Sequence, residues 1–167
     1  MVMHKNPSSF KRIRVRFYFV LICVTVFQLE ASAMSFGKQV CVFSAVEGTV
    51  LQDGKPVRDA LVKRSYKWDG EDVIDQQTTD EDGRFSFPEA NEKSLMAIFP
   101  HNPAVTQFIK FVVDDTEYLA WGYVKGNYDV NGELEGRAMN LKCDLNSPEA
   151  THKLTSFKSY GGICELL

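Results

Sequence analysis

The stretch that decides the fold is EGTVLQDGKPVRDALVKRSYKWDGEDVIDQQTTDEDGRFSFP, from Glu47 to Pro88. Short runs of apolar and β-branched residues alternate in it with turns that contain glycine. Asp53-Gly54 supplies the positive φ values of a tight hairpin turn, and Gly83 gives a second turn the same freedom. Short strands separated by such turns are typical of an all-β sandwich. We therefore expect an all-β fold.

The segment from Val57 to Trp68 follows the first turn and alternates between apolar and polar side chains. A period of two places successive residues on opposite faces of a strand. Arg64 interrupts the apolar face, whose other members are Ala60, Val62, Tyr66 and Trp68. After the second turn, Phe85 and Phe87 are expected to point to one side of the next strand.

The remainder of the chain carries similar patterns. Polar residues at 89–93 indicate a connection, and 127–136 is expected to be mostly loop around an Asn131-Gly132 turn. Further strands are expected at residues 39–51 (with a bulge at 45–48), 95–99, 105–113, 117–125 and 137–145. Together with the central stretch this makes about seven or eight strands and no long amphipathic helix.

The central stretch resembles the repeating signature of transthyretin-like domains, a group that includes carboxypeptidase regulatory-like modules. The motifs that carry the resemblance are Gly-x-Val50, Asp53-Gly-Lys-Pro-Val57, Ala60-x-Val62 and Thr79-Asp-Glu-Asp-Gly-Arg-Phe85. The resemblance implies one transthyretin-like (prealbumin-like, Ig-like) sandwich over residues 34–145, and it implies no activity. Cys41-Val-Phe-Ser and Glu117-Tyr-Leu-Ala-Trp also resemble small uncharacterised bacterial proteins built on this domain, which implies an exported Gram-negative protein.

Residues 1–33 have the layout of a signal peptide. A basic front precedes an apolar run from Phe17 to Phe27, and Ala31-Ser32-Ala33 offers small residues for cleavage. The run is shorter than the about 20 residues that cross a bilayer. We therefore expect cleavage before Met34, an exported protein that is periplasmic or extracellular, and no membrane span after cleavage.

Loss of residues 1–33 would remove five of nineteen basic residues and one of twenty-two acidic residues, which leaves fourteen against twenty-one. An acidic domain is unsuited to nucleic acid and to anionic membrane surfaces, and it attracts basic partners. The alternative is that the charge serves solubility alone.

Three cysteines remain after cleavage, in a compartment where disulfides persist. Cys143 lies in an alternating strand, on the inward row of Met139, Leu141 and Leu145. The tail, residues 146–167, ends with a Gly161-Gly162 pair that could return Cys164 to this strand, so we predict a Cys143–Cys164 disulfide. Closing that loop would add roughly 3 kcal/mol. Pairing of Cys41 with either cysteine stays open, because spacing does not fix connectivity.

The residues that could carry catalysis or bind a metal are few. His101 and His152 have no Ser, Cys or carboxylate at a spacing that suggests a triad, so we expect surface loops and no catalytic residues. Asp80 and Asp82 are a weak calcium alternative, supported by Asp69, Glu71 and Asp72 in what we take to be a neighbouring loop. The pattern is not that of an EF-hand, and we expect no cofactor.

Aromatic residues are the remaining candidates for binding: Trp68, Tyr118, Trp121, Tyr123 and Tyr128. Aromatic side chains dominate small β cores, so we expect most of them inside. Any on the outward face of the 105–125 hairpin would form a recognition patch.

These observations favour a non-enzymatic exported module that binds another protein, such as an envelope component. A second hypothesis is a periplasmic immunity protein that neutralises a secreted, basic toxin. A third is a hydrolase, because 5-hydroxyisourate hydrolase has a transthyretin-like fold. That enzyme family has a histidine near its start and a Tyr-Arg-Gly-Ser type ending, whereas this chain ends Ile163-Cys-Glu-Leu-Leu167.

Overall fold

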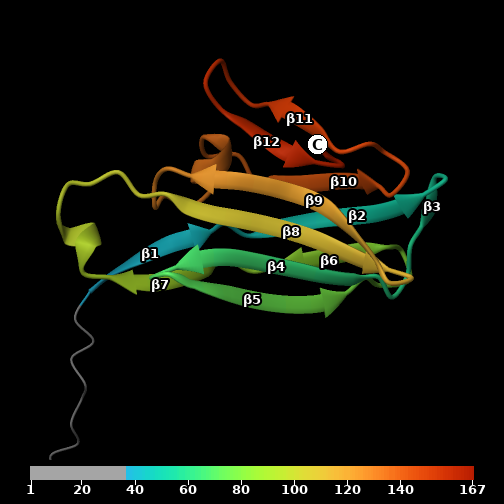
Figure 1. Ribbon diagram of the computed structural model, residues 1–167, viewed down its shortest axis with the longest axis horizontal. Coiled ribbons are helices and arrows are strands. Elements are labelled where there is room, and N and C mark those ends of the chain that lie inside the picture. The colour runs from blue at the N-terminus through green and yellow to red at the C-terminus, as the bar shows by residue number, and fades with distance from the viewer. Residues whose placement is uncertain (1–36) are drawn as a thin grey trace, which may run out of the picture. The chain divides into compact units, whose positions relative to one another are not determined.

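Strands dominate the computed structural model, which describes residues 37–167 (Figure 1). The predicted leader and its cleavage site lie outside these residues. The elements are β1 (Lys38–Phe43), β2 (Val46–Gln52), β3 (Lys55–Pro56), β4 (Leu61–Trp68), β5 (Glu71–Thr78), β6 (Arg84–Phe87), β7 (Ala90–Ser94), the 3-10 helix η1 (Met96–Ile98), β8 (Val105–Val113), β9 (Thr116–Lys125), the 3-10 helix η2 (Gly132–Leu134), β10 (Met139–Asp144), β11 (Ala150–Lys153), β12 (Ser159–Gly162) and β13 (Cys164–Leu166).

The strands of the described chain form three sheets. The largest has six strands in the order β11-β12-β9-β8-β4-β5. The second has the order β13-β10-β2-β3, with β6 also paired to β2, and the third is the β1-β7 pair. β2 and β10 run parallel, whereas the other pairs are antiparallel.

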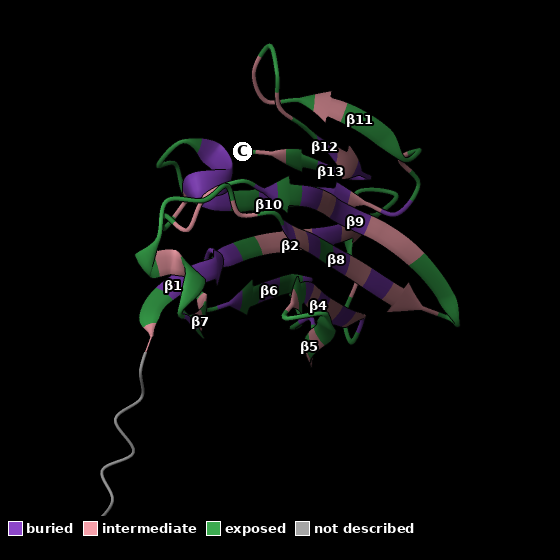
Figure 2. Ribbon diagram, turned by 60° about the vertical axis from the view of Figure 1, so that its left-hand side comes forward, coloured by how far each residue is buried: buried purple, intermediate pink, exposed green. Residues whose placement is uncertain are grey.

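The inward side chains of the two large sheets form one buried cluster, the core. Figure 2 shows in purple the stretches of these strands that are buried. Phe85 of β6 meets Phe111 of β8 edge-on, with ring centroids 5.6 Å apart. Met139, Leu141, Cys143 and Leu145, the inward row expected for 137–145, are all buried. Of the row expected for 105–113, Val105, Ile109 and Phe111 are buried and Val113 is partly buried. The prediction of an all-β sandwich is confirmed.

Both predicted turns are present. Asp53 and Gly54 have φ values of 52° and 74°, as a tight hairpin between β2 and β3 requires. Gly83 has φ 71°, and a Cβ placed there would lie 2.5 Å from the carbonyl oxygen of Val50. Gly83 is therefore required for its conformation and for the close approach of two backbones.

Arg64 interrupts the apolar face of β4 as expected, and it is buried with 2% of its surface exposed. Its guanidinium donates to both carboxylate oxygens of Asp75 and to the carbonyl of Pro88. It also lies over the rings of Phe43 and Phe87, at 5.3 and 4.8 Å from their centroids. These contacts satisfy the charge, so this polar residue is part of the core.

Three strand assignments were wrong. Residues 39–51 form two strands, β1 and β2, in different sheets, and polar residues 90–94 form β7 because their backbone pairs with β1. The expected buried strand at 95–99 is instead the exposed turn η1, since the Ser94 hydroxyl accepts the backbone N–H of Ala97 and turns the chain.

The predicted disulfide is confirmed. Cys143 and Cys164 face each other across β10 and β13 and are bonded. Cys41 is free and buried, which excludes the rival pairings. The tail is also part of the sheets. β11 and β12 extend the six-stranded sheet, and β13 pairs with β10 in the second large sheet.

Candidate functional site

Two of the five aromatic candidates, Trp121 and Tyr123, lie in the core, so they are not available as surface binding residues. Trp121 has 0% and Tyr123 8% of its surface exposed, and Trp121 stacks on Tyr160 at 4.4 Å. The pairing of β8 with β9 shifts between Ile109 and Lys110, so that Ala120 and Trp121 are both buried. Such a bulge changes which side chains face inward, and the sequence alternation does not show it.

The other three candidates are partly buried. Tyr118 packs against the core at the far end of the β8–β9 hairpin. Trp68, the last residue of β4, meets Tyr128 edge-on at 6.1 Å. His101 also contacts Tyr128, with 3.2 Å between the His101 Nε2 and the tyrosine hydroxyl. Trp68, Tyr128 and His101 are therefore one group, although the sequence places them on separate segments.

An exposed apolar turn adjoins this group. Leu95, Met96, Ile98 and Phe99 have 59%, 60%, 62% and 63% of their surfaces exposed. His101 links the two parts, because its Nδ1 lies 2.9 Å from the carbonyl oxygen of Phe99. We call the combined surface of Leu95, Met96, Ile98, Phe99, His101, Trp68 and Tyr128 the apolar end; its η1 turn lies at the left in Figure 1.

Carboxylates flank the apolar end. Asp69, Glu71 and Asp72 follow Trp68 directly, and Asp129 follows Tyr128. All four are exposed, and none forms an ion pair with another side chain in residues 37–167. Their charge is therefore available to attract a basic partner.

The two histidines are not arranged alike. His101 belongs to the apolar end, whereas His152 on β11 stacks on Tyr160 at 4.7 Å and has its Nε2 3.0 Å from the Gly162 carbonyl oxygen. Within the part of the chain that the structure describes, these contacts hold neither ring against a nucleophile.

The carboxylates of the weak calcium alternative are not neighbours. Asp80 and Asp82 lie beyond the end of β5, whereas Glu71 and Asp72 begin it, and eight strand residues span roughly 25 Å. Asp80 Oδ1 accepts the backbone N–H groups of Asp82 and Arg84, and Asp82 pairs with the Arg84 side chain. No three metal-ligating side chains come together among residues 37–167.

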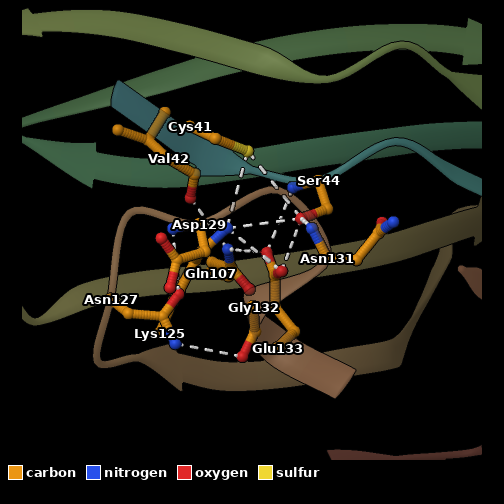
Figure 3. Close-up of polar contacts among 10 residues, drawn as sticks. All are labelled: Cys41, Val42, Ser44, Gln107, Lys125, Asn127, Asp129, Asn131, Gly132 and Glu133. Carbon is orange, nitrogen blue, oxygen red and sulfur yellow. Dashed lines mark hydrogen bonds and ion pairs between the residues drawn. The ribbon is translucent and has the colours of Figure 1, made fainter. Parts of the chain in front are cut away.

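A second arrangement, which the sequence did not reveal, is a buried polar cluster (Figure 3). Lys125, Glu133, Ser44 and Gln107 have 0% of their surfaces exposed, and Cys41 has 3%. Lys125 Nζ lies 3.1 Å from Glu133 Oε2, 3.3 Å from Ser44 Oγ and 3.5 Å from Cys41 Sγ. The cluster connects the end of β1, the strands β8 and β9, and η2.

Glu133 is the centre of the buried polar cluster. It accepts the Ser44 backbone N–H and hydroxyl at 3.1 and 2.5 Å, and the Gln107 amide at 2.8 Å. Burial alone would raise the pKa of Glu133, but the hydrogen bonds from Ser44 and Gln107 and the Lys125 charge outweigh it and hold this pKa below its ordinary value. The resting cluster therefore contains an ion pair.

One feature of the sequence indicates a buried polar contact in this cluster. Gln107 occupies an inward position between Val105 and Ile109, where a polar side chain needs a partner. The partner was not predictable, because Glu133 is directed inward by Asn131 and Glu135, both left-handed at φ 56° and 57°. The Asn131 backbone N–H donates to Ser44 Oγ at 2.8 Å and thereby fixes the loop to the end of β1.

In residues 37–167, no helix is long and apolar enough to cross a membrane. Residues 46–148, more than half of the chain, match the domain of unknown function DUF6795. No curated protein matches the chain. The chain therefore belongs to the DUF6795 family.

Proposed function

We propose that this member of the DUF6795 family acts by binding another protein through its apolar end. The observation that carries the proposal is the η1 turn, whose four large apolar side chains are each more than half exposed beside three aromatic rings. Contiguous exposed apolar groups are uncommon on soluble domains unless they meet a partner. Trp and Tyr, both present here, are frequent in the residues that dominate binding energy.

The flanking carboxylates indicate the chemistry of that partner. Asp69, Glu71, Asp72 and Asp129 surround the apolar residues along the chain and lack ion pairs in the described structure. A polar rim around an apolar centre is the usual anatomy of an interface. The partner would accordingly present an apolar surface with Lys and Arg side chains around it.

The proposal extends to the fold family and the compartment. We assign the sandwich to the transthyretin-like group, because the Asp53–Val57 and Thr79–Phe85 motifs form the two turns that their sequence signature implies. We place the protein outside the cytoplasm, supported by the Cys143–Cys164 disulfide, since such bonds persist in oxidising compartments. There the partner is an envelope component or a basic toxin, and the acidic rim favours the toxin and hence an immunity role.

Two phenylalanines provide a matched test. Phe99 lies in the apolar end with 63% of its surface exposed, whereas Phe157 lies in the β11–β12 loop with 99% exposed. In a pull-down at low salt with the exported domain as bait, Phe99→Ser should reduce capture of the bound protein at least about tenfold, the loss expected of a residue that contributes about 1.4 kcal/mol or more. Phe157→Ser should capture as much as the unchanged domain.

Circular dichroism would establish that both variants remain folded. Equal capture by the two variants, or the absence of any captured protein at low salt, would contradict binding through the apolar end.

A further inference from the structure

Gln107, Lys125 and Glu133 are arranged so that one carboxylate contacts both an amine and an amide. Lys125 Nζ lies 3.1 Å from Glu133 Oε2, and Gln107 Nε2 donates to Glu133 Oε1 at 2.8 Å. All three side chains have 0% of their surfaces exposed (Figure 3). A group that contacts an amine and an amide nitrogen together can transfer protons between them.

The strand register places Gln107 and Lys125 at diagonal positions of neighbouring strands. Val105 pairs with Lys125 and Gln107 with Tyr123 across β8 and β9. Gln107 and Lys125 are therefore diagonal neighbours, and both are on the buried face. Side chains this long can reach each other from diagonal positions.

The resting cluster holds two charges away from water. Placing both charges of an ion pair in a protein interior costs several kcal/mol per ion, and at Glu133 the hydrogen bonds from Ser44 and Gln107 and the Lys125 charge offset this cost. Gln107 Oε1 is also buried without a hydrogen-bond partner among the described residues. A reaction that removed the two charges would remove the desolvation cost that these contacts now offset.

We propose that Lys125 and Gln107 are a modification site, at which they condense to an intramolecular isopeptide bond with Glu133 as the proton carrier. Lys125 passes one proton to Glu133, and its neutral amine attacks Cδ of Gln107. The Cδ–Nε2 bond breaks as Glu133 protonates Nε2, and ammonia leaves. Glu133 then takes the second proton from the Lys125 nitrogen and ends as a neutral acid.

The step needs no oxidant or other reactant, and it removes both charges from the interior. Glu133 keeps the hydrogen bonds from the Ser44 N–H and hydroxyl that position it. Cys41 Sγ, at 3.5 Å from Lys125 Nζ, is the competing reactive group, but joining sulfur to nitrogen would require an oxidant. The isopeptide bond lowers the mass of the protein by one ammonia. A link between Cys41 sulfur and Lys125 nitrogen that includes an oxygen atom would raise it.

Peptide mass spectrometry of the exported full chain, reduced and digested with trypsin, tests the proposal. Gln107 falls in the peptide 94–110 and Lys125 would be an uncleaved site within 111–137. We expect these two peptides joined as one branched species. Its mass should be the sum of the two peptide masses minus the mass of one ammonia. Loss of ammonia at the Asn131-Gly132 bond would give the same mass change, but without a branch and with normal cleavage at Lys125.

Glu133→Gln provides the control, because it keeps the size and one hydrogen-bonding oxygen but cannot carry the proton. This variant should give separate, unbranched peptides, with the Cys143–Cys164 disulfide as the marker of a folded chain. If this variant does not fold, the presence or absence of the branched peptide in the unchanged protein still tests the isopeptide bond. Normal cleavage at Lys125 in the unchanged protein, or a sulfur-to-nitrogen link to Cys41, would overturn the proposal, and a branch in Glu133→Gln would overturn the role of Glu133.

Discussion

At the scale of single residues, the fold depends on positions where one side chain, or its absence, is required. Gly54 and Gly83 show the difference between two such requirements. Both have positive φ, at 74° and 71°. A Cβ at Gly54 meets nothing within 4 Å, whereas one at Gly83 lies 2.5 Å from the Val50 carbonyl oxygen. The two turns look alike in sequence, but only one holds two strands at close approach.

This difference gives a prediction for alanine substitutions. Gly54→Ala should lower the free energy of unfolding by about 1 kcal/mol, the cost of a left-handed non-glycine residue. Gly83→Ala should lower it by about 3 kcal/mol or more, because backbone must also move. Urea denaturation of the two variants measures the difference. Equal losses would show that the Gly83 turn relaxes without cost.

At the scale of elements, alternation identified β8 and β10 because each has an inward apolar row. It failed for β7, a polar strand that exists through its pairing with β1, and for η1, whose apolar residues are exposed. Pairing partners and solvent exposure are tertiary properties, which a local pattern does not contain. For the same reason the sequence did not show which of the aromatic candidates are buried, and it did not show the Trp68–Tyr128 contact or the partners of Gln107.

The tail elements give the next prediction. The disulfide joins β10 to β13 across a separation of 21 residues. Replacing both cysteines by Ser should lower the free energy of unfolding by about 3 kcal/mol, since the denatured chain regains the freedom of that loop. The comparison is urea denaturation of the oxidised protein and the double variant. Reducing the unchanged protein with dithiothreitol should give a similar loss, and an unchanged midpoint in both cases would contradict the prediction.

At the scale of the whole molecule, the described domain is acidic, and four of its carboxylates lie next to residues of the apolar end. Residues 34–167 carry fourteen basic and twenty-one acidic residues. The flanking carboxylates Asp69, Glu71, Asp72 and Asp129 have no ion pair among the described residues, whereas Lys63, Arg64 and Lys110 of the six-stranded sheet are paired. These four carboxylates adjoin the contact residues of the apolar end, so their attraction for a basic partner should act where we expect that partner to bind.

Charge reversal tests this arrangement. Glu71→Lys with Asp72→Lys should slow association with the captured partner about tenfold or more at low salt, because steering by opposite charge raises association rates. The effect should shrink as salt shortens the Debye length to about 8 Å at 0.15 M and less above it. Glu149→Lys with Glu165→Lys makes the same change in net charge on the tail, with Glu149 directly before β11 and Glu165 on β13 of the other large sheet. Surface plasmon resonance at several salt concentrations separates the two, and equal slowing by both pairs would mean that net charge, rather than the rim of the apolar end, attracts the partner.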